Sequence, residues 1–301
     1  MSGQLIVLAA LDGIAYAALI FMVAVGLTLI FGVLRILNVA HGSFYAIGAY
    51  AAASLGIGIV GAGLSPWLTF PALLLAAVLV GGILGGLIEH TLLKRIYVKE
   101  EVLQLLVTFA VFMILEDVQR LVWGVQPYFA AEPLRLLGNV SLFGIFYTSY
   151  QIILLPVAAV LILIGLRLFL RRTLTGRLIS AVTEDREMAT AIGIDAGRVY
   201  LVTFVLGATF AALGGALASP TTSLIPGMGA EMIVLSFAVV ATAGLGQVEG
   251  AALAALMIGL GRSLAVYLMP ELEVLVPYLV MVLVLLVRPQ GLFGVAERRR
   301  I

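Results

Sequence analysis

Long apolar runs separated by short polar stretches dominate this sequence. Nine runs can be traced, near residues 5–33, 38–60, 66–93, 102–123, 150–170, 198–219, 231–246, 250–268 and 274–288. Helices of about 17 to 25 residues cross the hydrocarbon core of a bilayer, whereas the strands of a β-barrel alternate over roughly ten residues. The pattern therefore predicts an all-α, polytopic transmembrane helical bundle.

Glycines and polar residues interrupt the second and seventh runs, 38–60 and 231–246. Each could be a full span or a broken helix buried against other helices, because irregular backbone is tolerated at membrane depth only where protein covers it. We therefore expect about eight to ten membrane helices. The polar segments 124–149 and 171–198 are too short for a soluble domain, so residues 1–301 are expected to form a single transmembrane domain.

The segment 171–198, RRTLTGRLISAVTEDREMATAIGIDAGR, is the densest mixed-charge part of the chain and must lie in water. Within it, EMATAIG predicts a short helix that ends at Gly193, because glycine accepts the left-handed conformation at a helix C-terminus. Thr183 is the predicted N-cap, which puts Glu184 and Asp185 in the first turn, at the positive end of the helix dipole. One compact helix between two spans is expected.

Lysine and arginine are unevenly distributed among the loops. Basic residues follow the third, fifth and ninth apolar runs, and cytoplasmic loops retain such residues. These loops share one side of the membrane if every run spans it. The pattern predicts an N-terminus outside, a C-terminus in the cytoplasm, a cytoplasmic loop at 171–198 and an outer loop at 124–149.

Composition narrows the class of protein. The chain has 301 residues, 63% of them hydrophobic, with a mean hydropathy of +1.20 and a formal net charge of +1. These values favour an integral membrane protein and give no indication of nucleic-acid binding. With no cysteine and only two distant histidines, no metal site is expected. The N-terminus lacks the basic region of a cleaved signal peptide, so the first run is expected to be retained.

Polar residues enter an apolar setting at the start of the second run. Asn38, His41, Gly42 and Tyr45 lie there, and an intramembrane polar cluster is a candidate functional site because such groups are costly in lipid. Gly42 could interrupt the helix and free backbone groups to meet a solute. Alternatively, Asn38 and His41 cap a helix that begins at the cytoplasmic surface, just after Arg35.

Further candidates lie in the last third of the chain. The turn AGLGQVEGA contains Gly244 and Gly246 and is either a tight reversal or a gate that faces the solute. Arg262 lies deep within its run and requires a partner or a route to the interface, although the sequence does not identify the partner.

Other ionisable residues lie near the ends of runs. Glu89 and His90 are expected to be solvated at the membrane interface. Glu116 and Arg120, four residues apart on one helix face, are expected to pair.

Three separated motifs together resemble the inner-membrane permease of branched-chain amino acid ABC importers, in particular the shorter of its two permease types. They are GLTLIFGVLRILNVAHGSFYAIGAY, then GRLISAVTEDREMATAIGID followed by VTFVLGATFAALGGAL, and finally LVLLVRPQGLFG. The resemblance spans nearly the whole chain. One departure lies in the glycine-rich turn, where Ala243, Gln247 and Glu249 occupy positions that are commonly glycine, serine and proline in the family.

The resemblance implies that the 171–198 segment is an ATPase-coupling loop. Glu187, Ala189 and Gly193 match the E-A-A-x-x-x-G skeleton of that loop, whose short helix docks in a cleft of the ATPase subunit. Met188 and Ile192, four residues apart, would present one apolar face to that cleft. Glu184, Asp185, Arg186 and Glu187 would supply polar contacts around it.

The resemblance also implies partners. They are a second, longer permease subunit, two ATPase subunits that use ATP and Mg²⁺, and an extracytoplasmic solute-binding protein. The chain itself has no GxxxxGK[ST] loop, so it is expected to bind no cofactor and not to be an enzyme. Urea or short amides are the alternative solutes. An ion-coupled secondary transporter and an intramembrane enzyme with His41 as its base are rival hypotheses.

Overall fold

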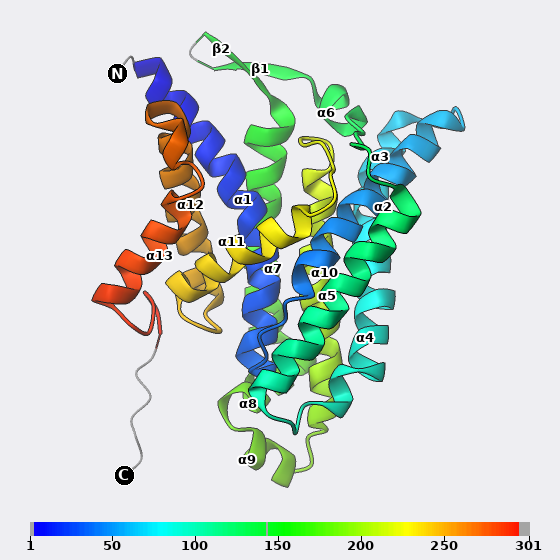
Figure 1. Cartoon of the computed structure of the whole chain (residues 1–301), viewed down its shortest axis with the longest axis vertical. Helices are drawn as coiled ribbons and strands as arrows, with labels where there is room; N and C mark the ends of the chain where they lie inside the picture. The colour runs from blue at the N-terminus through cyan, green and yellow to red at the C-terminus, as the bar shows by residue number, and fades with distance from the viewer. Residues whose placement is uncertain (1–2, 143, 295–301) are drawn as a thin grey trace.

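The computed structural model describes residues 3–142 and 144–294 as long helices packed side by side (Figure 1). Every apolar run forms helix, which confirms the predicted all-α membrane bundle. The corresponding helices are α1 (Gly3–Leu34), α2 (His41–Gly61), α3 (Thr69–Leu79) with α4 (Gly86–Thr91), α5 (Glu101–Trp123), α7 (Leu155–Arg172), α10 (Ala196–Ala218), α11 (Met228–Ala243), α12 (Val248–Leu268) and α13 (Val276–Val287).

Among the described residues, 6 helical segments are long and apolar enough to cross a membrane. They are Gln4–Leu34, His41–Gly61, Pro66–Arg95, Tyr150–Arg172, Ala196–Ala218 and Val248–Leu268. The π-helical stretch Val80–Gly85 joins α3 to α4, and another, Tyr150–Leu154, precedes α7. α11 and α13 are shorter apolar helices.

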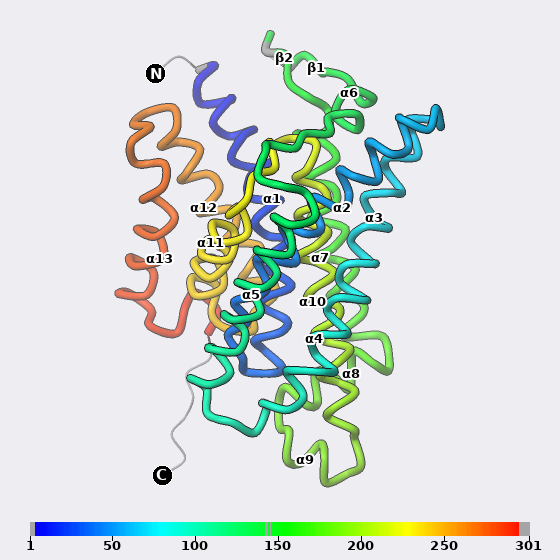
Figure 2. The backbone as a smooth tube through the Cα atoms, turned by 45° about the vertical axis from the view of Figure 1, so that its right-hand side comes forward, coloured from blue at the N-terminus to red at the C-terminus, as the bar shows by residue number. Residues whose placement is uncertain are grey.

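Short elements mark the two ends of the bundle (Figures 1 and 2). The hairpin end carries α6 (Glu132–Leu137) and an antiparallel hairpin of β1 (Asn139–Leu142) and β2 (Ile145–Thr148). The opposite end, here called the α9 end, carries α8 (Leu174–Glu184) and α9 (Arg186–Ala191). The hairpin was not expected from the sequence, which indicated only a polar connection at 124–149.

α1 and α10 run in opposite directions and cross near the centre of the bundle (Figure 2). A Cβ atom added to Gly26 of α1 would overlap the carbonyl oxygen of Gly207 in α10. Small residues permit such close approach, on which helix association in lipid depends. Each of the two helices also packs on two further helices. α1 packs on α11 and α12, and α10 packs on α2 and α3. The bundle therefore contains two similar groups of helices, which meet where α1 crosses α10.

α2 begins inside the bundle, not at its surface. The Nε2 atom of His41, the first residue of α2, lies 2.9 Å from the carbonyl oxygen of Val23, about three turns before the end of α1. Asn38 and His41 are fully buried. The interpretation in which both residues cap a helix at the cytoplasmic surface is therefore wrong, and the broken-helix alternative describes this segment.

α11 also begins at depth, and its first turn meets the first turn of α2. A Cβ atom on Gly42 would overlap the carbonyl oxygen of Gly229, and a Cβ atom on Gly229 would lie 2.7 Å from the carbonyl oxygen of Gly42. The irregular segment 219–227 connects α10 to α11 and ends at Gly227, with φ 93°. The second and seventh apolar runs thus form two helices that start against each other within the bundle.

Candidate functional site

The α9 end presents a short helix held at both termini. The side chain of Asp185 accepts a hydrogen bond from the Met188 N–H at 2.9 Å, so Asp185 is the N-cap. Gly193 has φ 93°, and the N–H groups of Gly193 and Ile194 donate to the carbonyls of Thr190 and Ala189 at 3.0 Å each. This pair of bonds is a Schellman motif, which confirms the predicted stop at Gly193.

The predicted start of this helix was wrong by two residues. Thr183 does not cap α9, because its hydroxyl donates to the carbonyl of Ile179 at 2.8 Å, within α8. Glu184 is the last residue of α8 and not part of the first turn of α9. The segment 171–198 therefore holds two consecutive helices, and the buried face of α8, which includes Ile179 and Val182, seats α9 on the bundle.

The two faces of α9 differ in exposure. Met188 and Ile192 are 62% and 72% exposed, whereas Ala189 is 3% exposed. Glu184, Asp185 and Glu187 are exposed as well. Exposed apolar side chains rimmed by charges are typical of an interaction site. The sequence-predicted coupling residues are thus brought together on one protruding element, with Ala189 facing the protein.

Arg186 connects α9 to the bundle through aromatic side chains. Its guanidinium carbon lies 5.3 Å from the ring centroid of Tyr200 in α10, a cation–π distance. Tyr200 packs edge-on against Tyr97, with ring centroids 5.0 Å apart. Tyr97 donates a hydrogen bond to a carboxylate oxygen of Glu89 at 2.8 Å. A continuous set of contacts therefore runs from α9 through α10 to α4.

Glu89 is 2% exposed, so the prediction that interfacial water solvates it was wrong. The hydroxyl of Tyr97 replaces that water. Burial, followed by the neighbouring Glu89 carboxylate, raises the pKa of Tyr97 well above its ordinary range. The phenol is therefore neutral and remains a hydrogen-bond donor to Glu89. By contrast, Glu116 and Arg120 form the predicted pair, with an N–O distance of 2.5 Å.

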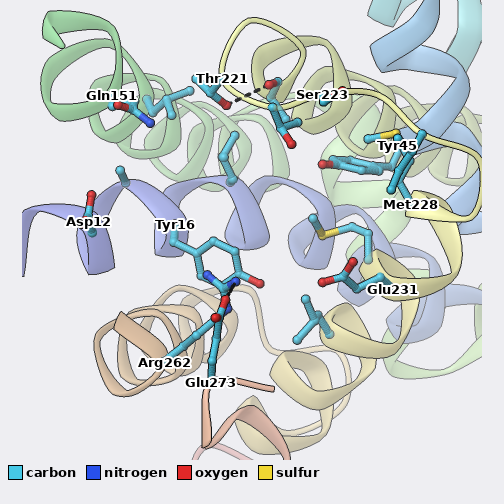
Figure 3. Close-up of a pocket in the computed structure, with 18 of the residues that line it drawn as sticks. Asp12, Tyr16, Tyr45, Gln151, Thr221, Ser223, Met228, Glu231, Arg262 and Glu273 are labelled. Carbon is cyan, nitrogen blue, oxygen red and sulfur yellow. Dashed lines mark hydrogen bonds and ion pairs between the residues drawn. The ribbon is translucent and has the colours of Figure 1, made fainter. Parts of the chain in front are cut away.

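A cavity with a volume of about 700 Å³ lies between α1, α11 and α12 (Figure 3). It reaches from Asp12, in the first half of α1, to Tyr45, one turn into α2. Its polar lining residues are Asp12, Tyr16, Tyr45, Gln151, Thr221, Thr222, Ser223, Glu231, Arg262, Ser263 and Glu273. A space of this size is sufficient for a small polar solute.

Most of the charged groups around this cavity are partnered. Arg262 forms an ion pair with Glu273, and its guanidinium carbon lies 4.0 Å from the ring centroid of Tyr16. The hydroxyl of Tyr267 donates a hydrogen bond to Asp12. The requirement that Arg262 have a partner is thereby met, by a residue in the connection between α12 and α13 that the sequence did not identify.

Of the residues predicted to line a solute path, Tyr45 and Arg262 line the cavity. Asn38, His41 and Gly42 do not; they lie where α2 meets α1 and α11. The Nδ1 atom of His41 and both polar atoms of the Asn38 amide are buried and have no hydrogen-bond partner among the described residues. Their role in a solute path stays a prediction.

Gly244 and Gly246 lie away from the cavity, toward the α9 end. The Leu292 and Phe293 N–H groups donate to the Thr242 and Ala243 carbonyls, at 2.9 Å each. The closing motif RPQGLFG therefore covers the glycine-rich turn at the end of α11. Gly246 approaches Gly32 of α1. The turn is a packed reversal, and its role as a gate stays a prediction.

Sequence reasoning missed Asp12, Tyr16 and Glu231. Asp12 carried an available signal, because an ionisable residue within an apolar run is a candidate functional residue. Glu231 fell at the expected start of the seventh run, where a carboxylate is unremarkable. No group of three or more His, Cys, Asp and Glu residues that could hold a metal ion occurs within residues 3–142 and 144–294.

A multi-pass helical bundle with a polar internal cavity and a protruding apolar helix face defines a membrane transport protein. Residues 9–285 match the family model described as the permease component of the branched-chain amino acid transport system, and the chain belongs to this family. It is therefore a membrane transport subunit.

Curated relatives match over nearly the whole chain. The high-affinity branched-chain amino acid transport system permease protein LivH of Salmonella typhimurium is 26% identical over 296 residues, which cover 96% of each chain. BraD of Pseudomonas aeruginosa, which has the same description, is 28% identical over 299 residues, again 96% of each chain. A probable LivH of Methanocaldococcus jannaschii is 28% identical over 304 residues, covering 94% of this chain and 90% of the relative. No solved structure matches.

Proposed function

We propose that the chain is a permease subunit of an ATP-binding-cassette importer that carries branched-chain or other amino acids. The single observation that carries the proposal is α9, a capped helix with Met188 and Ile192 exposed on a chain that has no nucleotide-binding loop. A transport subunit that does not hydrolyse ATP requires an element that receives mechanical work. The family assignment supports this role, and the relatives' names support the amino-acid substrate.

The α9 end is the proposed cytoplasmic end, in the inner cell membrane. Positive charges gather there and few lie at the hairpin end. The basic residues in or beside the loops of the α9 end are Arg35, Lys94, Arg95, Lys99, Arg171, Arg172, Arg177, Arg186 and Arg198. This orientation puts the N-terminus outside and the C-terminus inside. The hairpin and α6 then face the proposed extracytoplasmic binding protein.

Two ATPase subunits would dock on the α9 of this chain and on that of a second permease subunit, a longer homologue. Closure of the ATPases on binding ATP and Mg²⁺ would displace α9, and the contact of Arg186 with Tyr200 would pass that movement to α10. Because α10 crosses α1 at Gly26 and Gly207, a shift of α10 moves the helix that lines the cavity. This chain would bind no cofactor of its own.

Co-purification tests the proposal. The complex is isolated in detergent and its subunits are identified. ATP-driven uptake of leucine, isoleucine, valine and urea is then measured in proteoliposomes, with the binding protein supplied on the side that the hairpin end faces. We expect ATPase subunits to co-purify and at least one amino acid to be taken up. Uptake of urea in place of amino acids would favour the alternative solute, whereas uptake driven by an ion gradient without ATP would refute the importer assignment.

Variants of α9 test its role within that complex. Gly193→Ala and Glu187→Ala are expected to lower ATP-driven uptake while part of the complex still assembles. Alanine is strained at φ 93°, at a cost of about 1 kcal/mol, so the first variant disturbs the end of α9. Normal uptake by a variant that carries both substitutions would contradict the coupling role of α9.

A further inference from the structure

Glu231 is the one carboxylate on the cavity wall that has neither an ion pair nor a hydrogen bond with its side chain among the described residues. It lies in the first turn of α11, and Figure 3 shows its carboxylate directed into the cavity between Tyr16 and Tyr45. Glu231 is exposed, and as a lining residue of the cavity its carboxylate is open to a solute there. The site therefore favours a cation that arrives from elsewhere.

The other charges of the cavity do not supply that cation. Arg262, the one basic residue among the described residues that line the cavity, is already paired with Glu273 and stacked on Tyr16. Asp12 accepts the hydrogen bond from Tyr267. One guanidinium faces three carboxylates in the cavity wall, so the wall carries an excess of negative charge when all four groups are ionised.

Two hydroxyl-bearing residues add polar groups to the cavity wall. Tyr45 lines the cavity and is 5% exposed, and its hydroxyl points into the cavity in Figure 3. Ser263, also 5% exposed, lines the same cavity, and its hydroxyl is without a partner. Buried polar groups normally have hydrogen-bond partners, which the Ser263 hydroxyl lacks among the described residues, and the Tyr45 hydroxyl offers a donor to a solute in the cavity.

We propose that Glu231 is the counter-ion for the protonated amine of the solute, and that the cavity thereby selects amino acids over neutral amides such as urea. Leu19, Met228, Met232 and Leu235 form the apolar part of the wall and suit an aliphatic side chain. Arg262 retains N–H donors beyond those that bind Glu273 and faces the solute carboxylate. The inference rests on the proposed importer function and deepens it by naming the recognised group.

The test compares charge at position 231 in the reconstituted complex. ATP-driven uptake of L-leucine is measured for wild type, Glu231→Gln and Glu231→Asp. We expect the glutamine variant to lose roughly ten- to one-hundred-fold in uptake rate at low leucine, because a hydrogen bond to a charged group is lost, and the aspartate variant to retain more. Glu249→Gln is the matched control, because Glu249 lies outside the cavity and makes only an exposed 3.7 Å pair with Arg167.

A second measurement needs no variant. The thermal unfolding midpoint of the purified wild-type complex is compared with L-leucine and with 4-methylpentanoate, which has the same side chain and carboxylate but no amine. We expect leucine alone to raise the midpoint. Equal stabilisation by both compounds would overturn the inference, as would unchanged leucine uptake by Glu231→Gln. Absence of ATP-driven leucine, isoleucine and valine uptake by the wild type would instead overturn the proposed function.

Discussion

At the scale of single residues, the contact between Gly42 and Gly229 sets how closely α2 and α11 approach. A methyl group at Gly42 would overlap the Gly229 carbonyl, and neither backbone can move without disturbing its helix. We predict that Gly42→Ala lowers the free energy of unfolding by roughly 1–3 kcal/mol, the usual cost of overpacking. Thermal unfolding of the detergent-solubilised protein measures this change.

Gly58 provides the matched control for that substitution. It lies in the same helix, and a Cβ atom there would meet nothing within 4 Å. Gly58→Ala is expected to leave stability unchanged or to raise it by up to about 1 kcal/mol, because alanine restricts the unfolded chain. Equal loss in both variants would show that the contact with Gly229 does not control the effect.

The sequence predicted some cavity residues and not others for identifiable reasons. Arg262 was predicted because a guanidinium deep in an apolar run needs a partner, and Tyr45 because it lies in a polar cluster. The cavity itself depends on α1, α11 and α12 meeting in space, so the contribution of Tyr16 could not be derived from local pattern. The pairing of Arg262 with Glu273 likewise depends on how the connection from α12 to α13 folds back.

At the scale of elements, α9 is expected to act through its exposed face. We predict that Ile192→Asp lowers ATP-driven uptake at least about tenfold, because a carboxylate replaces an apolar contact in the docking surface. The stability of the isolated chain should change by no more than about 0.5 kcal/mol, since Ile192 is solvent-exposed. Uptake in proteoliposomes and thermal unfolding measure the two effects.

Thr190→Ala is the control for that variant. Thr190 is exposed on the same helix but lies off the face formed by Met188 and Ile192, and its hydroxyl donates only to the Arg186 carbonyl of its own turn. Uptake by this variant should match wild type. If Ile192→Asp also transports normally, the apolar face of α9 does not dock an ATPase.

Hydropathy predicted where the helices lie in the sequence, but not how deep within the bundle each helix begins. Every apolar run became helix because a chain in lipid satisfies its backbone polar groups within the segment. The start of α2 at the level of Val23 could not be derived in this way. Segment 35–40 returns alongside α1, and the hydroxyl of Thr108 in α5 donates to the carbonyl of Leu37 at 3.2 Å, a contact distant in sequence.

At the scale of the whole molecule, the proposed orientation can be tested because the chain contains no cysteine. Single cysteines at Thr190, in α9, and at Phe146, in the hairpin, occupy exposed positions at opposite ends. We predict that a membrane-impermeant maleimide labels Phe146→Cys in intact cells and Thr190→Cys only after the membrane is opened. The reverse labelling pattern would invert the topology.

The sequence predicted that the chain forms a bundle of membrane helices, but not which helices pack against one another. Hydropathy predicted a helical membrane protein, whereas the orientation that the charge distribution indicates stays a prediction. The crossing of α1 with α10, and the corresponding surroundings of each, arise from contacts such as Gly26 with Gly207 that join distant parts of the chain. A glycine in a membrane run indicates close packing but not which helix it packs against.

The closing motif RPQGLFG has a consequence for synthesis. The last carbonyls of α11 have no partners within that helix, and the Leu292 and Phe293 N–H groups, which leave the ribosome about fifty residues later, satisfy two of them. α11 therefore cannot reach its final capped state until translation is nearly complete.

A chain cut after Val287 is expected to insert into the membrane, lose about 1–3 kcal/mol of stability and be degraded faster, whereas one cut after Gly294 keeps both bonds. Pulse-chase measurement of the two truncated chains distinguishes these outcomes, and equal lifetimes would show that this late closure does not matter.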